Sequence, residues 1–284
     1  MLNAVRNELQ KIFIHKRNYV ILVGHLLFMF LCYLGFKLTP ELHMKQRVMS
    51  GSAFEIDNFT KMLDGLFFAR VALYPTFLAL MPTAICVIAG EIISGETQEG
   101  SLRLYLARSR SRTQVLLSKI IAVYLVNLLY CLYFAAISIA LGIYFFGANP
   151  TQLVLGSNQV IGSDFTLMSF GQALGRHFIV VIYFSFSLMS LASLAIFFSA
   201  LFNRMTAAST ASITFYFVCY IFSALPLAEV LKPYLLSEAM NNAFLLWMPE
   251  IAWNNLATNL AVLTLYIAGF SATALIVFNY KDIN

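Results

Sequence analysis

Residues 115–146 read VLLSKIIAVYLVNLLYCLYFAAISIALGIYFF and hold one charged side chain, Lys119. A helix that crosses a membrane needs roughly 20 apolar residues, because a hydrocarbon core of ~30 Å is covered at ~1.5 Å per residue. This run exceeds that length. It therefore predicts a transmembrane helix that is tilted or protrudes into water.

The composition of the whole chain agrees with this run. Of 284 residues, 60% are hydrophobic and 11% are charged, and the mean hydropathy is +0.79. An ordinary soluble domain has about 45–50% apolar and about 25% charged residues. These values exclude a soluble enzyme, a disordered chain and a disulfide scaffold. They predict a polytopic all-α integral membrane protein built as a single domain over residues 1–284.

Five further runs meet the length requirement. In lipid an unpaired backbone is too costly, so each run predicts a helix. The six predicted spans are about Tyr19–Phe36, Leu66–Ala89, Val115–Phe146, Leu174–Phe202, Ala207–Ala228 and Leu256–Phe278.

The distribution of Lys and Arg predicts the orientation. With the N-terminus inside, 11 basic residues fall in inner segments and 7, Arg70 among them, in outer ones. The positive-inside rule therefore predicts that both termini are cytoplasmic, in a multi-pass protein of the cell membrane. The first run is too long for a signal peptide and lacks a small-x-small cleavage site before Lys37, so we interpret it as a retained helix.

Three segments are not plain spans. Residues 1–17 predict an amphipathic helix in the cytoplasmic interface, either a simple anchor or a contact for a partner. Residues 37–65 predict a helical lead-in to span two, with capping-box spacing at Ser52–Glu55. Residues 229–255 are too apolar for a free loop and predict a re-entrant pair of short helices broken at Pro249. Trp247 and Trp253 are alternatively interface anchors.

The loop between spans two and three, residues 91–112, carries the most information. Three acids come first, Glu91, Glu96 and Glu99, followed by a leucine-rich step and by arginines. Acids at the start of a helix and bases at its end complement the helix dipole. The pattern predicts a short helix along the membrane surface. Positive-inside flanking alone accounts for the arginines but not for the glutamates.

This loop resembles the first cytoplasmic loop of bacterial type-2 ATP-binding-cassette exporter permeases. It differs where many relatives have proline, since Ser109 and Arg110 stand there. The order of interfacial helix, six spans, loop and re-entrant segment is also similar to that family. The matching positions are Glu96, Gly100, Ser101, Leu102, Ser111, Arg112, Ser118 and Lys119.

The resemblance implies a transport subunit. A coupling helix, about Thr97–Ala107, would dock on a separate ATPase, with Gly100 allowing close approach. Glu96 and Glu99 would face basic groups on the ATPase or on the chain's own N-terminal helix. Two permeases, identical or similar, would pair and bind two ATPases that hold ATP and Mg²⁺. The implied coupling residues are Glu91, Glu96, Glu99, Gly100, Ser101, Leu102, Arg103 and Arg112.

The resemblance also implies that spans two and five approach a central path. Phe67, Phe68 and Phe77 lie in span two, and Phe215 and Tyr216 lie in span five. These aromatic residues are candidates for lining the path, while helix packing explains them equally well. The substrate class stays open.

Other function classes were weighed against this one. The chain has no G-x-x-x-x-G-K-[ST] phosphate loop, so it is expected to bind no cofactor and to be no enzyme itself. An ATP-independent transporter or channel is the alternative, with His25 or Asn127 as mid-membrane polar groups; helix-to-helix hydrogen bonds are the competing interpretation. The scattered histidines and cysteines predict neither a metal site nor intramembrane catalysis. The net charge of +5, without a recognition motif, predicts no nucleic-acid binding.

Overall fold

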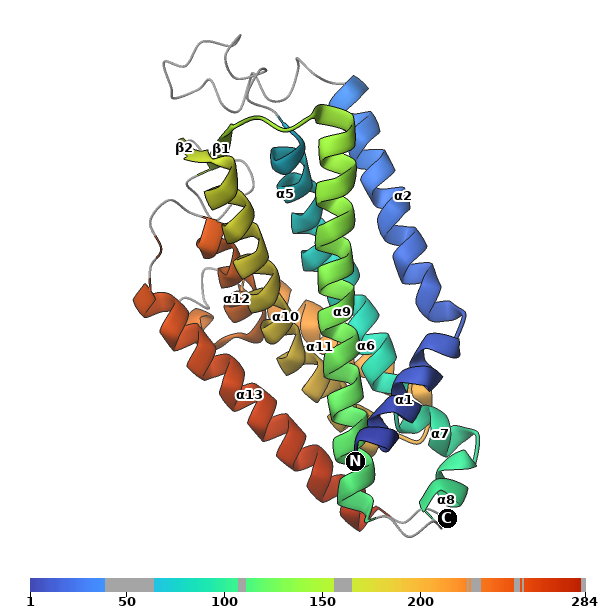
Figure 1. The fold of residues 1–284 in the computed structure, drawn as a ribbon. Helices are drawn as coiled ribbons and strands as arrows, with labels where there is room; N and C mark the ends of the chain where they lie inside the picture. The colour runs from blue at the N-terminus through green and yellow to red at the C-terminus, as the bar shows by residue number, and fades with distance from the viewer. Residues whose placement is uncertain are drawn as a thin grey trace.

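Within the residues that the structure describes, six long helical spans form the body of the computed structural model. Figure 1 shows their arrangement. All six are long and apolar enough to cross a membrane, which confirms the predicted all-α membrane fold. Span two consists of three consecutive helical segments, treated below. The other spans are α2 (Arg17–Leu38), α9 (Arg112–Phe146), α10 (Phe170–Leu201), α11 (Met205–Ser223) and α13 (Trp253–Tyr280). The structure describes residues 1–38, 64–106, 111–155, 165–223, 225, 231–247, 251 and 253–281.

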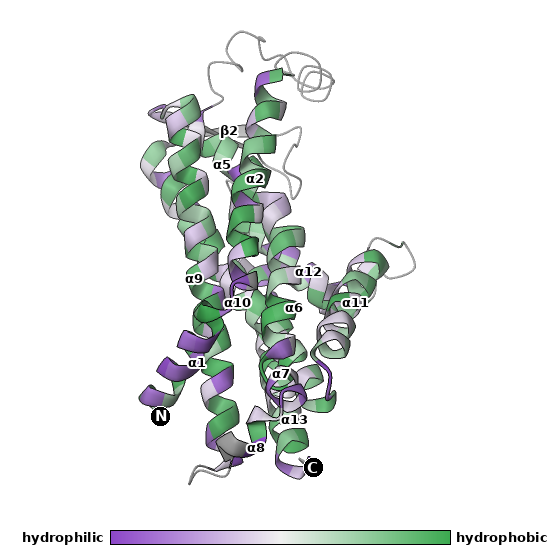
Figure 2. Ribbon diagram, turned by 90° about the vertical axis from the view of Figure 1, so that its right-hand side faces the viewer, coloured by the Kyte–Doolittle hydropathy of each residue, from purple (hydrophilic) through white to green (hydrophobic). Residues whose placement is uncertain are grey.

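The helix α10 is the centre of the bundle. It packs against α6, α9, α11 and α13 and is the most buried of the six spans. By contrast, few residues of α2 and α13 are buried, and many of their exposed side chains are apolar. Figure 2 shows the mainly hydrophobic ribbon of α2. Exposed apolar side chains along helices of this length suit a hydrocarbon solvent.

Span two is broken in the middle. It consists of α5 (Gly65–Pro75), a π-helical turn η1 (Thr76–Leu80) and α6 (Met81–Glu91). Proline has no amide hydrogen and crowds the preceding turn, so Pro75 and Pro82 disrupt the regular hydrogen-bond ladder. The sequence shows the two prolines but does not predict the π-helix between them.

Two contacts between small residues bring helices close together. A Cβ built on Gly65 of α5 would overlap the backbone of Gly142 in α9, and the reverse also holds. A Cβ built on Gly90 of α6 would lie 2.7 Å from Ser209 Oγ and 2.9 Å from Ser209 Cα in α11. Glycine at these positions therefore permits backbone contact between the helices.

A small hairpin closes the end of the bundle opposite the chain termini. The strands β1 (Thr151–Leu155) and β2 (Phe165–Ser169) pair antiparallel, with Thr151 opposite Ser169. Ser169 and Gln172 then form a capping box that starts α10. These two strands were not predicted from the sequence.

Three of the described segments between α11 and α13 are short helices. They are η3 (Lys232–Tyr234), α12 (Leu236–Asn241) and η4 (Asn242–Trp247). Trp247 is buried, whereas Trp253 is largely exposed. The depth of η3, α12 and η4 in a membrane stays a prediction, and so does the re-entrant interpretation of this segment. Pro249 and the predicted lead-in with Ser52–Glu55 lie outside the described residues.

Candidate functional site

The end of the bundle that carries both chain termini, called the termini end below, holds a cluster of charged side chains on three helices. The first is α1 (Leu2–Ile14), which packs on α9 through a buried face that includes Val5 and Ile12. The Asn18 side chain donates to the carbonyl of Ile12 (2.6 Å) and closes the end of the helix. The N-terminal helix is therefore present, and it is four residues shorter than the predicted 1–17. Its place in a membrane interface stays a prediction.

The loop after span two folds into two short helices instead of one. They are α7 (Ser94–Gln98) and α8 (Ser101–Leu106), and Gly100 separates them with φ +73°. The predicted single helix over Thr97–Ala107 is wrong, because this left-handed conformation interrupts a helix and favours glycine. A Cβ on Gly100 would meet open space, so the structure gives no close approach at this position within the chain.

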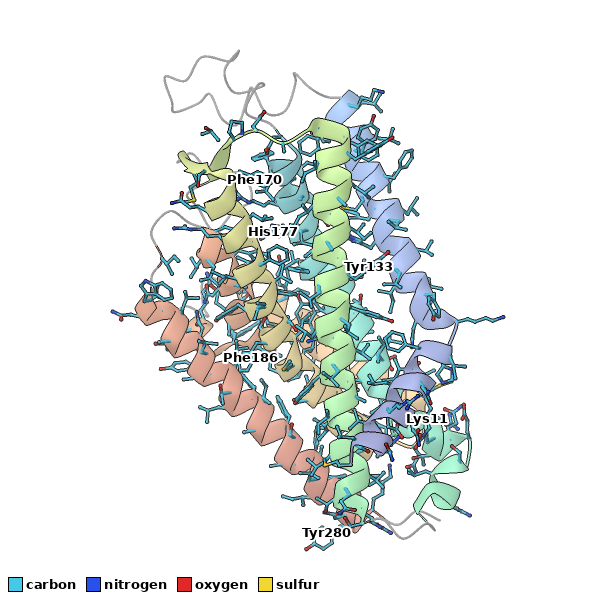
Figure 3. The ribbon with its side chains drawn as sticks, in the orientation of Figure 1. Lys11, Tyr133, Phe170, His177, Phe186 and Tyr280 are labelled. Carbon is cyan, nitrogen blue, oxygen red and sulfur yellow. The ribbon has the colours of Figure 1, made fainter. Side chains whose placement is uncertain are left out.

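Four charged side chains alternate around a ring that joins α1, α7 and α9 (Figure 3, near Lys11). Lys119 of α9 pairs with Glu8 (2.9 Å) and with Glu96 (2.8 Å). Lys11 of α1 pairs with the same two acids, at 3.0 Å to Glu8 and 2.7 Å to Glu96. Each charge thus contacts two charges of the opposite sign. We call these four residues the charge ring.

Because most of the charge ring is buried, the loss of one of its ion pairs lowers the free energy of unfolding. The side chains of Glu8 and Lys119 have no exposed surface, and that of Glu96 is 15% exposed. Burial alone raises the pKa of Glu96, but the charge of Lys119 and the hydrogen bonds from both lysines lower it below its ordinary value overall. Burial lowers the pKa of Lys11, but the hydrogen bond and charge of Glu96, with the charge of Glu8, raise it overall. Both shifts therefore favour the charged forms of Glu96 and Lys11 at neutral pH.

A pocket of about 430 Å³ opens beside the ring, between α1, α7 and the start of α11. Three of the glutamates predicted for coupling, Glu91, Glu96 and Glu99, reach it together with Ser101. The opposite wall comes from α1 and the residues after it, including Lys11 and His15. The pocket is thus a cleft with a mainly acidic wall.

The chain matches one known protein family, and this match shows its class. The family described as ABC-2 family transporter protein matches the chain over residues 2–283, which is nearly its whole length. The chain belongs to this family. It is a membrane-spanning permease of an ABC transporter and is not itself the ATPase. A search of curated proteins found no match.

The permease brings most of its predicted coupling residues to one place. Glu99, Gly100, Ser101 and Arg103 are exposed around the break between α7 and α8, while Leu102 is fully buried and anchors α8 in the core.

Arg112 is the exception. It donates to the carbonyls of Phe278, Asn279 and Lys281, and so caps the end of α13. A cation at this end of a helix complements the dipole.

The permease also packs most of its candidate path residues inside the chain. Phe77 stacks on Phe184 of α10 at 4.3 Å between ring centroids, and Phe68 lies against the ring of Phe146 in α9. Tyr216 and Phe67 are buried as well, and Phe215 is partly buried.

The neutral polar residues of the spans make contacts between helices. Asn127 donates to the Ser185 carbonyl at 2.8 Å. His25 lies with its two ring nitrogens 3.4 Å from Thr76 Oγ1 and from Ser138 Oγ. These contacts favour the packing interpretation over ion coupling.

Sequence reasoning missed the buried charges. Glu8 was not singled out, although its spacing of three from Lys11 allows a pair on one helix face. Lys119 and Arg70 were counted as flanking charges, yet both are buried within helices of the bundle. Arg70 lies in α5 and donates to the Ala173 carbonyl (3.3 Å).

Proposed function

We propose that this permease exports a substrate from the cytoplasm by alternating access, driven by a separate ATPase that docks on the 91–112 loop. The observation that carries the proposal is the construction of α7 and α8. The pair is fastened into the bundle on one side and exposes Glu99, Gly100, Ser101 and Arg103 on the other. A segment of this kind can receive a force from outside and pass it on.

The fastening reaches three spans. The segment α7 follows α6 directly along the chain. The charge ring links its Glu96 to Lys119 of α9. The amides of Ile93 and Ser94 both donate to Ser199 Oγ of α10, each at 3.0 Å. A displacement of α7 therefore acts on α6, α9 and α10 together.

Family membership supports an external energy source, because permeases of this family work with an ATPase subunit. We propose that two ATPases supply ATP and Mg²⁺, one at each termini end of a permease dimer. Four of the other five spans pack closely around α10, and the candidate path residues are largely buried within the chain. A path between two permeases is consistent with this packing. Both termini would then be cytoplasmic, in the cell membrane.

The test uses the permease reconstituted with its ATPase. We expect the double charge reversal Glu99→Lys/Arg103→Glu to weaken ATPase binding on the order of tenfold, as for charges at the rim of an interface. Stimulation of ATP hydrolysis by substrate should fall with it. The matched control is Lys37→Glu. It reverses an exposed charge at the end of α2 that lies away from the termini end.

Wild-type binding and stimulation in the double reversal would contradict docking on this loop. Substrate movement by the permease without any ATPase would instead favour the ATP-independent alternative.

A further inference from the structure

The π-helix of span two lies between two helix pairs that are each held by a contact of small residues. Above it, α5 meets α9 backbone to backbone at Gly65 and Gly142. Below it, α6 meets α11 at Gly90 and Ser209. Contacts this close leave little room for sliding within a pair. Within span two, a relative motion of the two pairs would therefore be taken up by the segment Thr76–Leu80.

The hydrogen bonds in this segment are irregular. The amide of Thr76 bonds to the Leu73 carbonyl, three residues back, and the amide of Met81 bonds to the Thr76 carbonyl, five residues back. The Thr76 hydroxyl donates to the Ala72 carbonyl (3.0 Å), which the Thr76 amide does not reach. π-helical turns inside α-helices are frequent at functional sites and mark local changes of helix winding.

One carbonyl in the segment depends on another helix. In a regular α-helix the amide of residue 82 would bond to the carbonyl of Leu78, but Pro82 has no amide hydrogen. The hydroxyl of Tyr216, in α11, donates to this carbonyl at 2.6 Å. Tyr216 is 2% exposed, so water does not readily replace it. The side chain of one span thus satisfies the backbone of another at the position where proline removed the donor.

We propose that Thr76–Leu80 is a hinge between two helix pairs, α5 with α9 and α6 with α11, and that Tyr216 is the positioning residue that holds it. At the hinge the contact with α10 is the stack of Phe77 on Phe184, whose planes differ by 1°. Flat rings can shift over one another with little loss of contact area. The segments α7 and α8 follow α6 along the chain, and the hinge stands whether or not an ATPase docks there.

The first test is a double-mutant cycle on the purified permease alone, read by hydrogen exchange of the amides in residues 76–83. Tyr216→Phe removes the hydroxyl and leaves a buried carbonyl without a donor, so exchange should speed up roughly tenfold. Pro82→Ala supplies an amide hydrogen for the same carbonyl. In the Pro82→Ala background, Tyr216→Phe should therefore change exchange less than about twofold. Tyr220→Phe, one turn further along α11, is the matched control and should leave exchange unchanged.

The second test measures motion. Spin labels are placed at Leu129 of α9 and Val218 of α11, both exposed, in labelled chains diluted with unlabelled ones. Tyr216→Phe should broaden the distance distribution between the two labels, and adding Pro82→Ala should narrow it again.

Equal acceleration of exchange by Tyr216→Phe in both backgrounds would overturn the role of the hydroxyl. A distance distribution unchanged by Tyr216→Phe would overturn the hinge. Neither outcome bears on docking of the ATPase, which is measured separately.

Discussion

Two segments of the permease are built from short helices between long spans, and they are held in opposite ways. The pair α7–α8 is fastened by the charge ring and by hydrogen bonds to Ser199, and it keeps one face exposed. The pair α12–η4 is fastened by apolar side chains, with Met240, Phe244 and Leu246 almost fully buried. The first segment is therefore held mainly by ion pairs and hydrogen bonds, and the second by the packing of buried apolar side chains.

The difference has a physical consequence. Ion pairs depend on pH and on both partners being present, whereas apolar burial depends on shape and area. Phe244 lies 4.6 Å from the ring of Tyr74 and 5.0 Å from that of Trp247, measured between centroids. We therefore expect α12–η4 to be insensitive to pH and α7–α8 to respond to it. This contrast in pH response can be tested with variants of both segments.

The largest effect is expected for Lys119→Met. It leaves the fully buried Glu8 without one of its two cations, and breaking one side of a buried ion pair costs about 3–5 kcal/mol. The free energy of unfolding of the purified permease in detergent measures this loss. In the double variant Glu8→Gln/Lys119→Met no buried carboxylate remains at position 8, so most of the loss should be recovered. An equal loss in the single and double variants would show that Lys119 acts through packing alone.

The apolar counterpart is Leu246→Ala in η4. Removing a buried leucine side chain costs about 3 kcal/mol through lost transfer energy and the cavity left behind. The same unfolding measurement should give this loss equally at pH 4 and pH 7. A loss that depends strongly on pH would break the contrast between the two segments.

The pH dependence of the charge ring follows from the pKa shifts of two of its members. The pKa of Glu96 lies below its ordinary value of 4.5, so its stabilising contribution is present above that pH and is lost as the pH falls through the lowered pKa. The pKa of Lys11 lies above 10.5, so its contribution is complete below that pH and is lost as the pH rises through the raised pKa. We expect a plateau between about pH 5 and pH 10. Unfolding midpoints across pH should show a weaker acid limb in Glu96→Gln, and an unchanged limb would contradict the assignment.

The smallest effect is expected at Gly100. Its positive φ disfavours an alanine by about 1 kcal/mol, while asparagine tolerates this conformation better. Gly100→Ala should therefore reduce substrate-stimulated ATP hydrolysis by the reconstituted complex more than Gly100→Asn does. If both variants fail equally, contact with a partner, rather than backbone conformation, determines the residue at this position.

The long helices could be predicted from the sequence because each is an apolar run of sufficient length. The ends of α9 and α10 lie within four residues of the predicted ends, because the apolar runs begin and end there. The α1 helix was predicted from the helical spacing of its apolar residues. These features depend on local sequence alone.

The charge ring and the broken span could not be predicted, because they depend on residues far apart in the chain. Lys119 resembles a flanking charge until Glu8 and Glu96 are placed around it. Pro82 indicates a kink, but only the position of Tyr216 shows how the free carbonyl is satisfied. The left-handed conformation of Gly100 could not be predicted, since a single glycine does not reveal whether space or φ requires it. Close approach of a partner at this position stays a prediction.

The pairing of Glu8 with Lys119 sets an order of events during biosynthesis. The two residues are 111 positions apart. At about 5–20 residues per second, roughly 6–22 s pass between the synthesis of the acid and that of the lysine. Throughout this interval α1 is complete while its partner in span three does not yet exist. The α1 helix therefore reaches its final place only after the start of the third span has been synthesised.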